Sequence, residues 1–509
     1  MVYIPGFLIN KVYERGSLQN TENGFEFCFM NRMTPMRISG MRDLKLEVDG
    51  VRYPTDRISL VLGGKPIQLQ SGSTDGTIEF NKASKLAVRV AGDSLTDGKH
   101  IVKIGFITNE YGGATLKVSD IIGDRTTHTL VGRVKQWFSE RGKPKRREPI
   151  MIEGELGGVP LDPDFSRLEA ALRREEPDRI PLFEAEIAMP IQEWFLGREI
   201  NGVEDEIEFY IRAGYDYVPA LPPFFTPRLM RTASDEDGSL SDDDRERAWL
   251  TESEGLIKTI RDVENFPWPK AEEVDFSSFH EIAELLPPKM KTLGMLSPAA
   301  VFGNTSQSMG LEQFSYALYD DPKLVEALFE IIGATYVAIT KRLVQMPRLG
   351  AVFMSDDLAH TGGCLVSPKI YRKHVFPWYR KIGDILDGAG LPFLFHSDGK
   401  LWDVLDDLAD CGVKAIHPVE PQAMDIVELK RRYGGVFCIF GNIDLDYTLP
   451  RGTVEEVEAL VKKRIAELGP GGGYGLAASN SIPDYVKPEN YRAMIETAMR
   501  YGKYPISVS

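Results

Sequence analysis

Cysteine is scarce in this sequence. The 509 residues include only four, Cys28, Cys364, Cys411 and Cys438, and no two of them form a CxxC pair. A disulfide framework or a cysteine-rich structural zinc site needs closely spaced cysteines, so neither is expected. Isolated cysteines fit a reducing compartment, and we expect a cytoplasmic protein.

Long apolar runs and an excess of basic residues are also missing. No apolar stretch approaches the roughly 18 residues that a transmembrane helix needs, and the first residues do not follow the pattern of a signal peptide. Acidic residues outnumber basic ones by 75 to 60, which gives a formal net charge of -15, and the longest basic block is "KPKRRE" at 143–148. We therefore expect neither a membrane nor a nucleic acid as partner.

Residues 1–122 carry short runs that alternate between apolar and polar residues. Asp-Gly and Gly-Gly pairs separate several of these runs, and such pairs favour tight hairpins. The clearest runs are "LKLEVDGVRYP" (44–54), "ISLVLGGKPIQL" (58–69) and "KLAVRVAG" (85–92). This pattern predicts an all-β sandwich or jelly-roll domain over 1–122, followed by a polar, partly helical linker over 123–164.

Residues 165–509 change to apolar runs that alternate with long amphipathic segments. The predicted strands are 179–186, 215–222, 291–299, 350–357, 392–398, 414–421, 436–444 and 474–481. The predicted helices between them include 323–344, 368–390, 401–412 and 454–469. Eight strand-then-helix units in this length predict a (β/α)8 TIM barrel, so the fold class is α/β with an all-β domain in front.

Polar residues stand where the predicted barrel strands end. They are Glu184 and Glu186, Asp356 and Asp357, His396 and Asp398, His417 and Glu420, Asn442 and Asp444, and Ser479 and Asn480. Barrel enzymes build their sites from the loops that follow the strands, so these side chains predict one site at that rim. Alternatively, some of them are N-caps of the following helices, which also favour Asp, Asn and Ser.

His396 and Asp398 lie two residues apart at the end of one strand, in "LPFLFHSDGKLWDVL". Side chains at this spacing leave the same face of a strand, so they can converge on one ligand. They can act as metal ligands or as an acid/base pair. A structural alternative is that Asp398 and Gly399 form the turn into the next helix.

Several stretches of the barrel resemble the uroporphyrinogen decarboxylase superfamily. They include "PDRIPLFE" (177–184), "GLEQFSYALYDDPKLVEAL" (310–328), "LFHSDG" (394–399) and "FGNIDLDYTLPRGTVEEV" (440–457), and they occur in order along 165–505. The resemblance implies a TIM barrel. It also implies either porphyrinogen decarboxylation or transfer of a methyl group between a methylcobamide and a small molecule.

The methyltransferase branch carries zinc ligands that match this chain only in part. Thiol methyltransferases of the superfamily have a His-x-Cys motif after the fifth strand and a further Cys after the eighth. His396 keeps the first position, whereas Asp398 and Asn480 replace the two cysteines. A site with a carboxylate and an amide in place of thiolates is harder and less suited to zinc-thiolate chemistry, so the substrate is expected to be other than a simple thiol. A zinc ion held by His396 and Asp398 with Glu420 stays open as one alternative.

The decarboxylase branch fits less well. The resemblance places a substrate-binding arginine in an early loop, but "AEIAMPIQEWFLG" (185–197) has none. It also places an aspartate after the second strand and a histidine near the last strand. Here "YVPALPPFF" (217–225) lacks the aspartate and Asn480 stands at the histidine position. Porphyrinogen decarboxylation is therefore not expected.

The N-terminal domain resembles the small β subunits of bacterial C-glycoside-cleaving enzymes. The similar stretches are "LEVDGVRYPTDRISLVLGGKPIQL" (46–69) and "LTDGKHIVKIGF" (95–106). This resemblance implies an accessory domain that shapes or covers a barrel mouth.

Three functions remain open at this point. The first is a corrinoid-linked methyltransferase, with a methylcobamide supplied by a corrinoid protein. The second is a lyase or hydrolase that uses a His/Asp pair on a small aromatic, carboxylated or glycosidic substrate. The third is a binding scaffold without activity, and a homodimer is one option for the assembly. The predicted catalytic residues are His396, Asp398, Asp357, Asn442 and Asn480.

Overall fold

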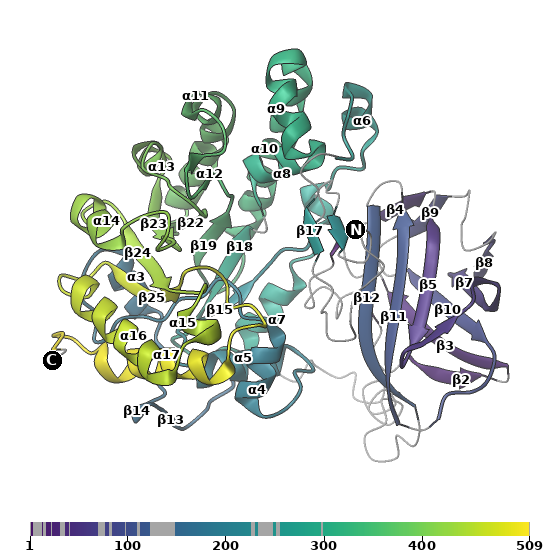
Figure 1. Ribbon diagram of the computed structural model, residues 1–509, viewed down its shortest axis with the longest axis horizontal. Helices are drawn as coiled ribbons and strands as arrows, with labels where there is room; N and C mark the ends of the chain where they lie inside the picture. The colour runs from purple at the N-terminus through teal and green to yellow at the C-terminus, as the bar shows by residue number, and fades with distance from the viewer. Residues whose placement is uncertain are drawn as a thin grey trace. The chain divides into compact units, whose positions relative to one another are not determined.

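The structure of the protein, a computed structural model, describes most of the chain. The described residues are 2–3, 13, 17–21, 23–30, 36–39, 41–69, 77–80, 84–96, 98–108, 112–122, 148–224, 230–232, 248–250, 255–296 and 299–507. The chain divides into two compact units (Figure 1). The β unit comprises Met1–Arg146, Pro223–Asp275 and Asn304–Leu328, and the barrel unit comprises Arg147–Pro222, Phe276–Gly303 and Phe329–Ser509.

The predicted boundaries at 122 and 165 remain predictions. Most of the predicted linker, residues 123–147, lies outside the described residues. Its last part, 148–164, belongs to the barrel unit and contains the short strands β13 (Glu155–Leu156) and β14 (Val159–Pro160).

The β unit is built mainly from antiparallel strands. Its strands are β1 (Val2–Tyr3), β2 (Gln19–Thr21), β3 (Gly24–Met30), β4 (Met36–Ser39), β5 (Arg42–Val48), β6 (Val51–Tyr53), β7 (Ile58–Leu62), β8 (Lys65–Ile67), β9 (Thr77–Phe80), β10 (Lys85–Ala91), β11 (Gly98–Thr108), β12 (Gly112–Ile122), β16 (Met230–Thr232) and β17 (Ala248–Leu250). Its helical segments are η1 (Thr55–Arg57), α6 (Ile260–Asn265), η3 (Ala271–Glu273) and α9 (Leu311–Asp320).

Two five-stranded sheets hold most of these strands. Their orders are β1-β12-β11-β5-β6 and β2-β3-β10-β7-β8. Phe27 and Val88 from one sheet and Leu46 and Val102 from the other belong to one buried cluster, because the alternating pattern gives each strand one apolar face. The N-terminal region is thus mainly β, as the sequence predicted.

The barrel unit alternates strands with helices. Its remaining strands are β15 (Tyr217–Ala220), β18 (Lys291–Leu296), β19 (Leu349–Ser355), β20 (Ala359–His360), β21 (Gly363–Cys364), β22 (Phe393–His396), β23 (Val413–His417), β24 (Cys438–Ile443) and β25 (Tyr474–Ala478). Its helices are α3 (Ser166–Leu172), α4 (Met189–Leu196), α5 (Val203–Arg212), α7 (Ser277–Leu285), α11 (Pro368–Ile370), η4 (Tyr371–Val375), α12 (Phe376–Gly388), α13 (Leu405–Asp410), α14 (Ile426–Tyr433), α15 (Thr448–Arg451), α16 (Val454–Leu468) and α17 (Pro488–Tyr501). Two more helices, α8 (Val301–Met309) and α10 (Pro322–Leu343), have residues in both units.

Seven parallel strands form the barrel sheet, in the order β15-β18-β19-β22-β23-β24-β25 (Figure 1). The first predicted strand, 179–186, is extended but is not a full strand. Phe183 donates its N–H to the Leu476 carbonyl and Leu476 donates to the Pro181 carbonyl, which joins this segment to β25. Pro181 has no N–H to give to a ladder, and this accounts for the interrupted pairing. The predicted α/β barrel fold is confirmed.

Burial of whole strands explains why polar residues at their ends stand out. Every residue of β22 and of β24 is buried, because helices cover the outside of the sheet and side chains fill its inside.

Among the helices that the structure describes, none is long and apolar enough to span a membrane.

A buried histidine links the stability of the β unit to pH. His100 Nδ1 lies 2.6 Å from Asp49 Oδ2, and His100 Nε2 lies 2.7 Å from the Thr96 carbonyl oxygen. Burial by itself lowers the pKa of His100, but these two acceptors outweigh it and raise the pKa above its ordinary value. The charged imidazole is therefore favoured in the folded state.

We predict that the β unit loses stability as the pH rises above about 6.5, the ordinary pKa of histidine. A raised folded-state pKa gives stability that is complete below the unfolded pKa of about 6.5 and is lost as the pH passes the folded pKa. His100→Gln should therefore cost about 1–2 kcal/mol at the acidic end and less at the alkaline end. Amide hydrogen exchange in β5 and β11 measures this, with His280→Gln on the exposed side of α7 as control. A cost that is the same at both pH values would contradict the linkage.

Candidate functional site

Two neighbouring barrel strands end level with each other. β19 and β22 run parallel, and their register pairs Ser355 with His396. Asp357 and Asp398 each lie two residues beyond that pair, so both carboxylates emerge at the same edge of the sheet. The register thus brings together two acidic residues that are 41 positions apart in the chain.

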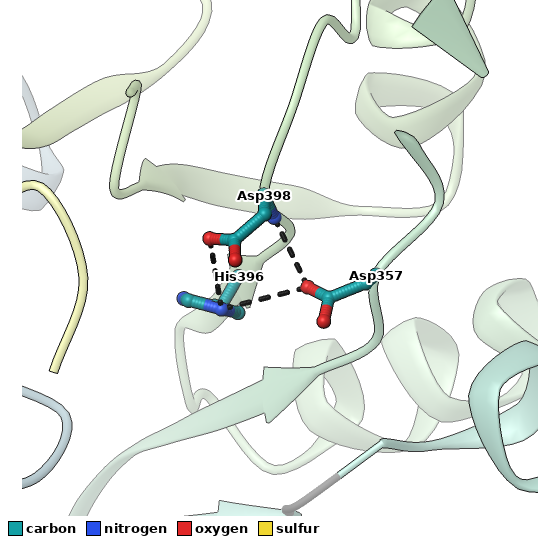
Figure 2. A group of neighbouring side chains, drawn as sticks. All are labelled: Asp357, His396 and Asp398. Atoms are coloured by element: carbon teal, nitrogen blue, oxygen red, sulfur yellow. Dashed lines mark hydrogen bonds and ion pairs between the residues drawn. The ribbon is translucent and has the colours of Figure 1, made fainter. Parts of the chain in front are cut away.

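Asp357, His396 and Asp398 form a tight group, here called the Asp-His-Asp cluster. His396 Nε2 lies 3.6 Å from Asp357 Oδ1 and 3.6 Å from Asp398 Oδ1 (Figure 2). Both distances are longer than a hydrogen bond. One ligand atom from each residue lies within 4.8 Å of the other two, and no other His/Cys/Asp/Glu group among the described residues meets this criterion. Such spacing suits a small cation.

The three side chains of the cluster differ in their exposure to solvent. The His396 side chain is 8% exposed, the Asp398 side chain 30% and the Asp357 side chain 52%. The cluster is therefore open to solvent on the side of Asp357, while His396 lies at its buried end.

Hydrogen bonds fix both carboxylates of the cluster. Asn480 Nδ2 donates to both carboxylate oxygens of Asp398, at 2.9 Å each. The backbone N–H of Asp398 donates to Asp357 Oδ1 at 3.0 Å (Figure 2). Asn480, which the resemblance matches with a cysteine of the thiol methyltransferases, here holds a neighbouring carboxylate in place.

Gly399 shapes the segment that carries Asp398. Its φ is 84°, and a Cβ atom at this position would lie 2.4 Å from the carbonyl carbon of Ala359, so only glycine fits. Its N–H donates to Glu420 Oε2 at 2.6 Å. Glu420 was expected to be the third metal ligand with His396 and Asp398. The geometry groups Asp357 with them instead, while Glu420 binds the adjacent backbone.

His417 lies directly behind His396. The register of β22 and β23 pairs the two residues, and their Nδ1 atoms lie 2.8 Å apart. The ring of His417 is fully buried, with the rings of Phe183 and Phe353 at centroid distances of 5.4 Å and 5.6 Å. Its Nε2 atom has no hydrogen-bond partner among the described residues.

Burial and like charges set the electrostatics of the cluster. Burial first, and then the carboxylates of Asp357 and Glu420, raise the pKa of Asp398 to about 8, although the amide of Asn480 acts against this. Burial lowers the pKa of His396, against the pull of Asp357, and burial together with His396 lowers that of His417. Gathering the carboxylates here is unfavourable without a compensating positive charge.

Two of the predicted rim residues act as helix caps. Asp356 accepts N–H groups from Phe302 and Gly303 at the start of α8, at 2.7 Å and 2.6 Å. Asp444 accepts the N–H groups of Tyr447 and Thr448 at the start of α15. The alternative interpretation as a cap of the following helix therefore holds for Asp444, whereas Asp356 binds the start of α8, a helix that precedes its own strand.

Other predicted rim residues face different partners. Asn442 is buried, and its Nδ2 donates to the Val419 carbonyl at 3.0 Å, while its catalytic role remains a prediction. Glu184 is fully buried and accepts the Ala478 N–H at 2.8 Å. Burial raises the pKa of Glu184 well above its ordinary value. Glu184 thus fastens β25 to the segment that completes the barrel.

Sequence reasoning missed two features of this site. It named Asp357 as catalytic but did not group it with the metal-ligand candidates His396 and Asp398, and it gave His417 no role beside His396. Both follow from strand register: once β19, β22 and β23 are aligned, Ser355, His396 and His417 stand level. A sequence without pairing information does not supply that alignment.

We predict that Gly399→Ala disrupts the site by displacing the backbone after Asp398. The backbone φ of residue 399 is 84°, and the added Cβ would lie 2.4 Å from the carbonyl carbon of Ala359. The chain must therefore shift, at a cost of about 2 kcal/mol or more. Denaturant unfolding measures this. Gly388→Ala at the end of α12 is the matched control, because nothing lies within 4 Å of its Cβ position. Equal stability of the two variants would show that the turn does not constrain Asp398.

Part of the chain matches a known protein family. Residues 254–501 match the family model described as uroporphyrinogen decarboxylase (URO-D). A uroporphyrinogen decarboxylase of Pseudomonas fluorescens is 25% identical over 255 residues, which cover 47% of this chain and 68% of that protein. A methylcobamide:CoM methyltransferase of Methanosarcina barkeri is 25% identical over 178 residues, 35% of this chain and 49% of that protein. A solved methyltransferase from Methanosarcina mazei has 18% identity and a TM-score of 0.48, and the match covers 66% of this chain and 98% of that one.

The N-terminal region matches a different model. Residues 8–123 match the one described as the N-terminal domain of hydroxymethylglutaryl-CoA reductase. The resemblance of this region to subunits of C-glycoside-cleaving enzymes remains a prediction. The resemblance of the barrel is confirmed: residues 254–501 are a domain of the uroporphyrinogen decarboxylase family.

Proposed function

We propose that this protein is a methyltransferase that moves a methyl group between an oxygen atom of a small substrate and a corrinoid. One observation carries the proposal, namely the convergence of the Asp-His-Asp cluster, whose donor atoms lie within 4.8 Å of one another at the rim of the barrel. The cluster would hold a divalent cation such as Zn²⁺.

The spacing of the cluster supports a cation. Tetrahedral zinc with nitrogen and oxygen ligands at about 2.0–2.2 Å keeps those ligands roughly 3.3–3.6 Å apart. The two distances from His396 Nε2, 3.6 Å each, agree with this without rearrangement of the strands. The positive charge would also relieve the repulsion between Asp357 and Asp398.

The donor types point to the chemistry of the substrate. One imidazole and two carboxylates make a harder set than the thiolates of the related thiol methyltransferases, so oxygen is the preferred incoming ligand. When bound, the cation supplies Lewis acidity to that oxygen. His396 provides the floor of the site, Asn480 holds Asp398 in its orientation, and the exposed Asp357 faces the entrance.

Methyl transfer accounts for the family relationship and for the changed ligands together. In the demethylating direction the carbon–oxygen bond of a methyl ether breaks, and the reduced cobalt of the corrinoid forms the new bond to the methyl carbon. The oxygen keeps the bonding electron pair and takes up a proton. The similarity to a methylcobamide:CoM methyltransferase supports this assignment, with a corrinoid protein as partner.

A lyase or hydrolase is the second candidate. The observation that favours it is the placement of His396 Nε2 at equal distances from two carboxylates. Such an arrangement also suits proton transfer by a His/Asp pair without any metal. The two candidates differ in whether activity depends on a bound cation.

We predict that the purified protein binds about one divalent cation per chain and that Asp357→Asn abolishes this. Methyl transfer from 2-methoxyphenol to cob(I)alamin should fall about 10²–10³-fold in the variant, since a metal acting as Lewis acid contributes several kcal/mol. Elemental analysis and the absorbance of methylcobalamin measure the two quantities. Asp387→Asn on α12 is the control for removal of an exposed carboxylate.

Each outcome separates the candidates. A wild-type protein without a cation, whose activity survives chelators and is lost in His396→Ala, would contradict the cation site and favour the lyase or hydrolase. A cation that is present without methyl transfer from ethers, but with transfer to a thiol, would contradict the assignment of an oxygen substrate.

A further inference from the structure

We infer that His417 is a positioning residue that directs the Nε2 lone pair of His396 toward the two carboxylates and so sets the affinity for a divalent cation. This inference rests on the cation site of the proposed function. It assigns a role to a residue that contacts neither the cation nor the substrate.

The contact between the two imidazoles permits one useful arrangement of hydrogens. Their Nδ1 atoms lie 2.8 Å apart, so one ring donates and the other accepts. His396 can offer a lone pair at Nε2 only when its hydrogen is on Nδ1. His417 Nδ1 must then be the acceptor, and its own hydrogen is on Nε2.

The surroundings of His417 hold its ring in the accepting orientation. The ring contacts Phe183 and Phe353, at centroid distances of 5.4 Å and 5.6 Å. The backbone carbonyl of His417 accepts the N–H of Ser397, the residue between His396 and Asp398. Full burial disfavours a charged ring, and a charged ring would have no lone pair to offer. The strand pairing therefore places an acceptor, and not merely an aromatic ring, behind His396.

The unsatisfied atom of His417 argues against a purely structural role. Its Nε2 is buried and has no hydrogen-bond partner among the described residues, which costs free energy in the folded state. An aliphatic side chain of similar size avoids that cost. A histidine at this position is therefore explained by its contact with His396 rather than by packing.

The test compares two variants of His417 in the full chain. His417→Asn keeps an acceptor at the place of Nδ1, whereas His417→Leu fills the space without one. Competition between the protein and a chelating dye gives the dissociation constant for Zn²⁺, and thermal unfolding of the metal-free protein gives its stability. We expect His417→Leu to weaken Zn²⁺ binding about 10–100-fold, and His417→Asn to stay within about threefold of wild type. The metal-free His417→Leu protein should melt no lower than the wild type.

The outcomes distinguish this inference from the proposed function. If the wild type binds no Zn²⁺, the cation site itself is wrong and the inference falls with it. If the wild type binds Zn²⁺ and His417→Leu binds it equally well, the positioning role is overturned while the proposed function stands. Equal weakening by both variants would also overturn it, because the loss would then come from packing and not from the acceptor.

Discussion

The arrangement of this barrel rim depends on one constraint. Two carboxylates face the same imidazole nitrogen. Asp357 and Asp398 approach His396 Nε2 to 3.6 Å without a hydrogen bond to it. Like charges at such proximity are unfavourable. Burial first, and then the neighbouring carboxylates of Asp357 and Glu420, raise the pKa of Asp398. Asn480, the backbone of Asp398 and the turn at Gly399 hold the group together despite this repulsion.

The same constraint explains how one fold can serve different chemistry. The barrel domain belongs to the uroporphyrinogen decarboxylase family, and its relatives include a methylcobamide:CoM methyltransferase. Where the resemblance implies two cysteines, this chain has Asp398 and Asn480, and the amide of Asn480 donates to the carboxylate of Asp398. In our account, a change in the donor atoms shifts the preferred substrate atom from sulfur to oxygen while the barrel that presents them is retained.

The sequence predicted the fold well because the barrel depends on local patterns. Buried strands appear in the sequence as apolar runs. Seven of the eight predicted strands belong to the barrel sheet, and Pro181 accounts for the exception. The site was predicted less completely. The spacing of His396 and Asp398 follows from a strand's period of two, but the grouping with Asp357 depends on pairing between strands, and the contact of Asn442 with Val419 depends on loop geometry. Neither leaves a periodic signal in one sequence.

The central claim is that Asp357, His396 and Asp398 form a single cation site. Anomalous X-ray diffraction from crystals of the zinc-loaded protein tests it most directly, because it locates the ion independently of activity. Our account predicts one peak among Asp357 Oδ1, His396 Nε2 and Asp398 Oδ1, at about 2.0–2.2 Å from each. A peak coordinated by Glu420 in place of Asp357, or none at this rim in a protein that binds zinc elsewhere, would contradict it.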